Sequence, residues 1–229
     1  MTLQQRIAHV NEKVAEACAR AGRSPEEVNI VAVTKYVSTE KTAQVFDSGI
    51  RHIGENRWQN AKPKWEALGS QGTWHFIGQL QSNKVKDVIG RFAYIHSLDR
   101  LSLAKELERQ AAASDIEVNV FVQVNVSGED SKSGMPPEEV YDFVRQLRDY
   151  SHLNVVGLMT MAPLDRDAEG ARPTFRGLRE LRDELNAREA WSAPIEHLSM
   201  GMSGDFEVAI EEGATWLRLG SILVGKEED

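Results

Sequence analysis

Cysteine is scarce in this 229-residue sequence, and long apolar segments are absent. The single cysteine, Cys18, excludes a disulfide within the chain and fits a reducing compartment. No segment approaches the ~18 consecutive apolar residues of a membrane-spanning helix. Charged residues interrupt the N-terminal segment, where a signal peptide would need an apolar stretch. We therefore expect a soluble cytoplasmic protein without a membrane partner.

Basic residues are also in deficit. The chain has 27 Lys and Arg against 35 Asp and Glu, which gives a formal net charge of -8. Proteins that bind DNA or RNA need clustered basic side chains to meet the phosphates, so we expect no nucleic-acid partner. The six histidines show neither H-x-x-x-H spacing nor a cysteine partner, which argues against a zinc site. Scattered apolar residues indicate no particular interface, and we expect a monomer.

The chain does contain a regular alternation of strand-like and helical segments. Eight strand-like segments cover residues 29–34, 51–55, 74–78, 92–97, 117–126, 153–160, 195–200 and 215–220. Helical segments between them include residues 39–49, 100–113, 136–150 and 173–189, and an amphipathic helix from Leu3 to Cys18 precedes them all. Such alternation is typical of parallel strands joined by helices. Eight units predict a single α/β domain over residues 1–229, a (β/α)₈ TIM barrel with an extra N-terminal helix.

Functional residues of parallel barrels follow the carboxyl ends of the strands. Lys35 follows the apolar run Ile30–Val33 at such an end. Burial disfavours the charged form of lysine, and a neutral amine is a nucleophile for aldehydes. Alternatively, Lys35 extends its amine to solvent at the barrel mouth or pairs with an acid such as Glu55.

Two later segments predict a phosphate site. Gly201, Ser203 and Gly204 precede a short helical pattern, and backbone N–H groups at a helix start attract anions. An alternative on local grounds is that Ser203 is an ordinary N-cap. Gly220 and Ser221 follow the last strand, where barrels of this type often complete a phosphate site.

Arg218 lies two residues before Gly220, so strand alternation places both on the same side. We assign that side to the barrel mouth. The guanidinium needs an acceptor there, either an acid such as Glu196 or Asp205, or a ligand with a ring nitrogen or an acidic group.

Together these features resemble the YggS/PROSC family of pyridoxal 5'-phosphate homeostasis proteins. The matching stretches are VAVTK, HIGENR, WHFIGQLQSNK, QVNVSGEDSKSGM, GLMTM, LSMGMSGDFEVAI and RLGSILVG. The resemblance implies a barrel like the N-terminal domain of alanine racemase and the barrel of ornithine decarboxylase. It also implies pyridoxal 5'-phosphate (PLP) as the cofactor, held as a Schiff base on a lysine.

The resemblance assigns roles to individual residues. Lys35 is expected to form the Schiff base, and Asn56 to lie close to the cofactor ring. The phosphate is expected on the Ser203 and Ser221 side chains and on the backbone of Met202 and Gly220. Arg218 is expected to face the pyridine nitrogen. Most family members have threonine at position 221, and serine keeps the hydroxyl.

These roles lead to two hypotheses within cofactor chemistry. A guanidinium stays protonated and disfavours protonation of the pyridine ring, which makes the ring a weaker electron sink. The first hypothesis is therefore a non-catalytic protein that binds PLP and buffers it or delivers it to PLP-dependent apoenzymes. The alternative is an amino-acid racemase that uses His75 or Tyr36 as its acid–base group. The printed chain ends after the eighth unit, without the β domain of alanine racemase, which argues against this alternative.

Two further hypotheses concern single lysines. A third function, from outside cofactor chemistry, is an aldolase-like barrel that uses Lys35 on a phosphorylated sugar. Lys132 follows the fifth strand and is predicted to be a secondary amine that captures or passes on the cofactor, the alternative being a solvated loop residue. The recipient of the cofactor is not indicated by the sequence.

Overall fold

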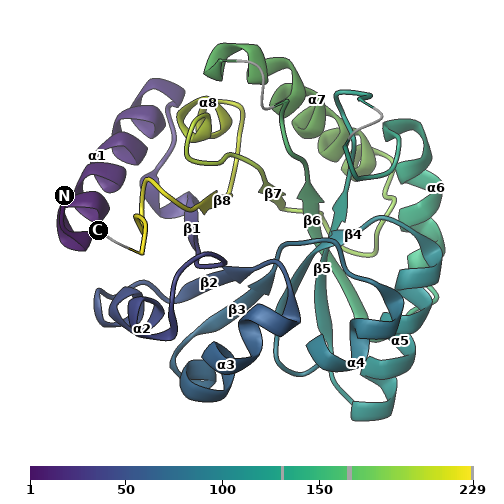
Figure 1. Ribbon diagram of the computed structural model, residues 1–229. Coiled ribbons are helices and arrows are strands. Elements are labelled where there is room, and N and C mark those ends of the chain that lie inside the picture. Colours follow the sequence, from purple (N-terminus) through teal and green to yellow (C-terminus); the bar gives the residue numbers. More distant parts are fainter. Residues whose placement is uncertain (130–131, 164–166, 228–229) are drawn as a thin grey trace.

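The computed structural model describes residues 1–129, 132–163 and 167–227 of the chain. Eight parallel strands close into a barrel in sequence order. They are β1 (Asn29–Val33), β2 (His52–Glu55), β3 (Thr73–Phe76), β4 (Tyr94–Leu98), β5 (Val118–Gln123), β6 (Leu153–Met159), β7 (His197–Ser199) and β8 (Trp216–Leu219). The α-helices are α1 (Leu3–Ala21), α2 (Thr39–Asp47), α3 (Trp58–Leu68), α4 (Val85–Val88), α5 (Leu101–Ser114), α6 (Pro137–Leu147), α7 (Ala168–Ala187) and α8 (Phe206–Glu211). Figure 1 shows them around the ring of strands, so the predicted barrel is confirmed.

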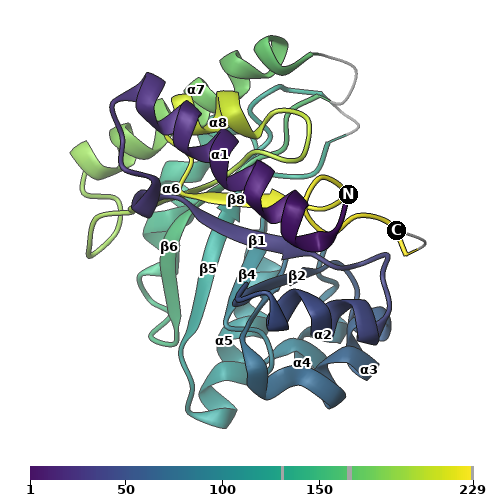
Figure 2. The same cartoon turned by 90° about the vertical axis from the view of Figure 1, so that its left-hand side faces the viewer.

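The predicted extra helix, α1, has well-formed ends. The Thr2 hydroxyl accepts a hydrogen bond from the Gln5 N–H, and the Gln5 side chain accepts one from the Thr2 N–H, which together make a capping box. Gly22 ends the helix in the left-handed conformation that glycine tolerates, with φ of 66°. The helix packs against α8 with Cys18 buried. Figures 1 and 2 place it on the side of the barrel where β1 and β8 meet.

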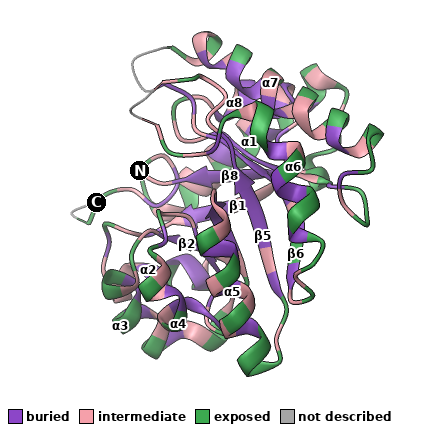
Figure 3. Ribbon diagram, turned by 90° about the vertical axis from the view of Figure 1, so that its right-hand side faces the viewer, coloured by how far each residue is buried: buried purple, intermediate pink, exposed green. Residues whose placement is uncertain are grey.

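Apolar side chains fill the layer between the strands and the helices. Figure 3 shows strands that are buried almost throughout and helices whose outward faces are exposed. In α6 the buried face consists of Val140, Phe143, Val144 and Leu147, as the helical spacing predicts. This layer anchors each helix and leaves the carboxyl ends of the strands open to the βα loops.

The closing strand pair determines which loops become neighbours. Val31 of β1 pairs with Arg218 of β8, and Ala32 pairs with Leu219. Because the strands are parallel, their carboxyl ends meet at the same end of the barrel. The residues after Val33 therefore lie beside those after Leu219, although almost the whole chain separates them in sequence.

Two of the element boundaries that differ from the sequence prediction have a clear structural cause. Helix α7 begins at Ala168, well before Pro173, because the Asp167 side chain accepts a hydrogen bond from the Gly170 N–H at 2.8 Å and caps the helix there. Pro173 lies inside the helix and lacks one N–H donor. Strand β5 ends at Gln123 instead of residue 126, and Val124 pairs with Met135 in an isolated bridge outside the strand.

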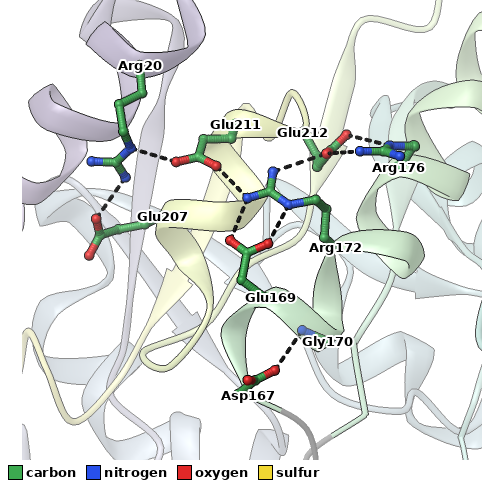
Figure 4. Close-up of polar contacts among 9 residues, drawn as sticks. All are labelled: Arg20, Asp167, Glu169, Gly170, Arg172, Arg176, Glu207, Glu211 and Glu212. Atoms are coloured by element: carbon green, nitrogen blue, oxygen red, sulfur yellow. Dashed lines mark hydrogen bonds and ion pairs between the residues drawn. The ribbon is translucent and has the colours of Figure 1, made fainter.

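An ion-pair network joins α1, α7 and α8 (Figure 4). Arg172 of α7 contacts Glu169 at 2.6 Å and Glu211 of α8 at 2.7 Å, and Arg20 of α1 also contacts Glu211 at 2.7 Å. An isolated ion pair at the surface contributes little to the stability of the fold, but several charges that contact one another in a network can contribute more. The network fixes α8 against two neighbours, and so fixes the loop before α8.

Among the described residues, no helix has the length and apolar content needed to cross a bilayer.

Candidate functional site

A cavity of about 670 Å³ lies at the carboxyl end of the barrel. Its lining comes from the segments after β1, β2, β3, β6 and β7 and from β8 with the residues that follow it. All seven residues that the sequence predicts for the site line this cavity: Lys35, Asn56, Met202, Ser203, Arg218, Gly220 and Ser221. The fold therefore brings the predicted site together at one place.

Lys35 lies in the turn after β1 and is half-buried. The strand ends at Val33, so Lys35 follows it by two residues. Its Nζ atom lies 4.9 Å from the ring centroid of Tyr36. Within the described part of the chain, no carboxylate lies within ion-pair distance of this amine. The amine therefore contacts an aromatic face instead of an acid, which leaves it available to a ligand in the cavity.

The alternative in which Lys35 pairs with Glu55 is wrong. Glu55 is fully buried at the end of β2, and its Oε1 atom accepts hydrogen bonds from the Lys64 Nζ at 2.8 Å and the Thr34 hydroxyl at 2.6 Å. Lys64 also donates to the Thr34 carbonyl oxygen at 2.5 Å. Because Lys64 comes from α3, the pairing depends on how that helix packs, and no sequence spacing indicates it.

The loop between β7 and α8 forms a tight turn at the cavity. The Met202 carbonyl accepts hydrogen bonds from the N–H groups of Asp205 and Phe206, at 3.1 and 3.0 Å. The Met202 N–H donates to Asp205 Oδ1 at 2.6 Å. Asp205 occupies the N-cap position of α8, so the alternative in which Ser203 is the N-cap is wrong. Gly201 has φ of 97°, and a Cβ atom there would lie 2.7 Å from the Ala209 Cβ, so the turn requires glycine.

A second turn follows β8. The Gly220 carbonyl accepts hydrogen bonds from the Leu223 and Val224 N–H groups, at 3.0 and 2.8 Å, which closes a helical turn. The first N–H groups of such a turn have no partner inside it. A Cβ atom at Gly220 would lie 3.8 Å from the Val33 Cβ, an ordinary contact. The fold itself therefore does not require glycine here, and the open backbone faces the cavity.

Arg218 forms a buried part of the cavity wall. Its Nη1 atom donates to the Ser199 hydroxyl at 2.6 Å, and its Nη2 atom donates to the Thr160 carbonyl oxygen at 3.0 Å. Neither Glu196 nor Asp205 forms an ion pair with it, so both predicted acid partners are wrong as direct contacts. Burial lowers the pKa of Arg218 to about 10, partly offset by the charge of Asp205. The guanidinium is still protonated at neutral pH.

The two acid–base candidates of the racemase alternative differ in their placement. His75 is fully buried inside the barrel, does not line the cavity, and has both ring nitrogens within hydrogen-bond distance of other histidines. Tyr36 does line the cavity but is 83% exposed, with the face of its ring toward Lys35. The structure therefore removes His75 from the candidate site.

Lys132 does not line the cavity. It lies in the loop after β5, where its N–H donates to the Glu129 carbonyl oxygen at 3.0 Å and its own carbonyl accepts a hydrogen bond from the Asn125 side chain at 3.5 Å. Its role in capturing or passing on a cofactor stays a prediction.

The chain end contributes residues that the sequence does not single out. Gly225, Lys226 and Glu227 line the cavity, and Glu227 Oε2 accepts a hydrogen bond from the Ser38 N–H at 2.8 Å. The charged residues of this segment do not indicate from sequence that it lines the cavity.

No group of three His, Cys, Asp or Glu side chains in the described ranges is arranged to hold a metal ion.

Comparison with known proteins identifies the family. The sequence model named "Alanine racemase, N-terminal domain" matches residues 6–228. A pyridoxal phosphate homeostasis protein of Aquifex aeolicus is 42% identical over 229 residues, which is the full length of both chains. The chain belongs to the pyridoxal phosphate homeostasis protein family. The family member of Escherichia coli K12 is 36% identical over 97% of this chain and 95% of its own.

Solved structures agree with this membership. PipY of Synechococcus elongatus, a structure with PLP bound, has a TM-score of 0.86 and 32% identity, and the match covers 98% of this chain and all of that one. Alanine racemase of Clostridium difficile has a TM-score of 0.75 but only 14% identity, over 96% of this chain and 56% of its own. At 14% identity, the similarity to alanine racemase concerns the fold alone. The resemblance drawn from the sequence motifs is thus confirmed.

Proposed function

We propose that this protein binds PLP in the 670 Å³ cavity, buffers it and delivers it to PLP-dependent apoenzymes without turning over a substrate. The observation that carries the proposal is the meeting of three complementary features in one cavity. These are an amine without an acid partner at Lys35, two turns whose residues line the cavity, and a guanidinium at Arg218. When bound, the cofactor supplies an electrophilic aldehyde and an electron-accepting ring.

Lys35 is the residue proposed to hold the cofactor covalently. Lys35 lines the cavity, is half-buried and has its amine beside the Tyr36 ring, and the buried acid Glu55 is already paired with Lys64. An amine that is not held in an ion pair is free to attack an aldehyde.

The two turns are proposed to hold the phosphate. The Met202 N–H already donates to an anionic oxygen, that of the Asp205 carboxylate at 2.6 Å, which stands in for a phosphate oxygen. Gly220 and Ser221 begin a helical turn at the same cavity, and the first N–H groups of such a turn, with the Ser221 hydroxyl, are proposed as further donors. Ser203 adds a second hydroxyl from the loop before α8. Hydroxyl and N–H donors of this kind bind phosphate without a metal ion.

Arg218 is proposed to face the ring nitrogen, with Asn56 beside the ring. Two of the guanidinium's five N–H donors are used by Ser199 and Thr160, so donors remain for a ligand. A protonated guanidinium can only donate, so it pairs with a ring nitrogen that carries no proton. Such a ring withdraws electrons weakly, and this supports a binding function over catalysis.

The test is the visible absorbance of purified protein after addition of PLP. We expect wild type to show the band of a lysine-linked cofactor and Lys35→Ala to lack it. Lys105→Ala, an exposed lysine on α5, is the control and should retain the band. Incubation with L- and D-alanine should cause no racemisation or transamination, and turnover with either one would restore the racemase alternative. Equal bands in wild type and Lys35→Ala would contradict the role of Lys35.

Delivery and oligomeric state need separate measurements. Protein loaded with PLP should activate a PLP-dependent apoenzyme that it is mixed with, and size-exclusion chromatography with light scattering should give the mass of a monomer. Failure to activate several such apoenzymes would limit the function to buffering.

A further inference from the structure

Three histidines form a hydrogen-bonded series inside the barrel. His52 Nδ1 lies 3.0 Å from His75 Nε2, and His75 Nδ1 lies 2.9 Å from His96 Nε2. His75 is level with Gly54 of β2, two residues beyond His52. It is also level with Tyr94 of β4, two residues before His96. Each histidine therefore lies two residues nearer the carboxyl end of the barrel than the one before it. The series therefore climbs across β2, β3 and β4 toward the cavity.

The series continues to the cavity wall through Ser199 of β7. His96 Nδ1 lies 2.8 Å from the Ser199 Oγ, and the Arg218 Nη1 donates to that same oxygen at 2.6 Å. We name His52, His75, His96 and Ser199 the histidine column. It connects the amino end of the barrel to the guanidinium that lines the cavity, and each of its links is within hydrogen-bond distance.

Arginine determines the direction of every hydrogen bond in the column. A guanidinium can only donate, so the Ser199 oxygen accepts from Arg218. Among the described residues, His96 Nδ1 is the remaining hydrogen-bond partner of the Ser199 hydroxyl. A buried hydroxyl proton without an acceptor is costly, so Ser199 donates and His96 Nδ1 accepts. A neutral imidazole that accepts at Nδ1 carries its proton on Nε2. His96 Nε2–H then donates to His75 Nδ1, so His75 also carries its proton on Nε2. By the same argument His75 Nε2–H donates to His52 Nδ1, and His52 has the same tautomer.

Packing holds the imidazoles in place. The His75 ring stacks on Tyr94 at 4.6 Å between centroids, and the His96 ring stacks on Phe121 at 4.2 Å. Both histidines are fully buried, and burial lowers the pKa of each well below its ordinary value. Because the rings are neutral and packed in place, all hydrogen bonds along the column run in the same direction.

We propose that the histidine column is a positioning device for Arg218. It fixes the plane of the guanidinium and leaves the remaining N–H donors pointed at the cavity, so that the site selects a heteroaromatic ligand with an unprotonated ring nitrogen. The part of this proposal that concerns ligand selection rests on the proposed PLP function. The part that concerns the histidine tautomers is independent of that function. The column residues act through Arg218 and do not themselves line the cavity.

The first experiment measures the tautomers without any ligand. Long-range ¹H–¹⁵N NMR of the ligand-free wild-type protein should show His52, His75 and His96 all protonated at Nε2 alone. A proton on Nδ1 of His75 or His96 would overturn the column as described, whether or not PLP binds.

The second experiment tests the coupling to Arg218 with Ser199→Ala. The matched control is Ser97→Ala, because Ser97 is also fully buried and its hydroxyl has no hydrogen-bond partner among the described residues. The dissociation constants to compare are those of PLP and of its carbocyclic analogue, which has C–H in place of the ring nitrogen. We expect Ser199→Ala to weaken PLP binding about tenfold, the effect of one lost charge-assisted hydrogen bond, and to leave the analogue nearly unchanged. Ser97→Ala should change neither.

Equal weakening of both ligands by Ser199→Ala, or an unchanged PLP affinity, would overturn the positioning role. If wild type bound no PLP, the proposed function would fail and ligand selection with it, and the NMR measurement would still decide whether the column exists. The tautomer signals of His96 in Ser199→Ala give a second check, since the loss of the hydroxyl should alter His96 most and His52 least.

Discussion

The inside of the barrel and the layer around it are both buried, but they contain different side chains. The layer between strands and helices is mostly aliphatic and includes large buried residues such as Phe175, Leu103 and Leu178. The inside contains the cluster around Val31, Phe121, Met159 and Trp216, together with the imidazoles of the histidine column. Apolar contacts have no direction, whereas each hydrogen bond in the column has one.

This difference separates stability from positioning. In the aliphatic layer, a side chain of similar size and apolar character can replace another with little loss. Inside the barrel, a substitution must also match a donor to an acceptor, because an unpaired buried polar group is costly. The layer therefore mainly stabilises the barrel, and the inside mainly determines which groups reach the cavity.

The largest effect is expected from a cavity in the aliphatic layer. Phe175→Ala on α7 should lower the free energy of unfolding by about 3–5 kcal/mol, because a fully buried ring is lost. Urea denaturation measures this loss. The histidine tautomers of the folded variant should be those of wild type, and altered tautomers would show that the two regions are not independent.

The ion pair of Lys64 and Glu55 is a polar exception beside the aliphatic layer. Lys64→Met should cost about 3 kcal/mol, because it leaves Glu55 buried without its counter-charge. The double variant Lys64→Met with Glu55→Gln should regain most of that loss, since the uncompensated charge is gone. Urea denaturation of the three proteins tests this, and a double variant no more stable than Lys64→Met would argue that the pair itself is required.

The histidines inside the barrel predict a pH dependence of stability. Their folded-state pKa is lowered, so below about pH 6.5 the unfolded chain binds protons that folded His75 and His96 do not. Stability should therefore fall as the pH drops from about 6.5 to 5, by about 1.4 kcal/mol per pH unit for each histidine. Above pH ~6.5 they add no slope. Urea denaturation across this range should give a smaller slope for His75→Gln, and an equal slope would contradict the assignment.

The smallest effect concerns the mouth of the barrel. Asp205→Asn should tighten PLP binding about fivefold, because it removes a negative charge beside the proposed phosphate turn. The asparagine oxygen can still accept the Met202 N–H. Fluorescence titration with PLP measures the change, and the gain should shrink at high salt. Weaker binding by the variant would place the phosphate away from this turn.

Much of the architecture was predictable from the sequence. All eight strands and the N-terminal helix were predicted, because apolar spacing acts over a few neighbouring positions. The seven predicted site residues line one cavity, because parallel strands bring their carboxyl ends together whatever the loops contain. The start of α7 was missed, since Pro173 is a stronger local signal than the cap at Asp167.

The partners of the buried polar groups were decided only by the tertiary structure. Glu55 pairs with Lys64 instead of Lys35, Arg218 bonds Ser199 instead of an acid, and His75 lies inside the barrel. Each of these contacts joins different elements and depends on strand register, barrel closure and helix packing. The sequence by itself determined the elements and the end of the barrel where the site lies, because those follow from local periodicity and chain direction. Which donor meets which acceptor was set by the closed barrel, because only there do distant strands face one another.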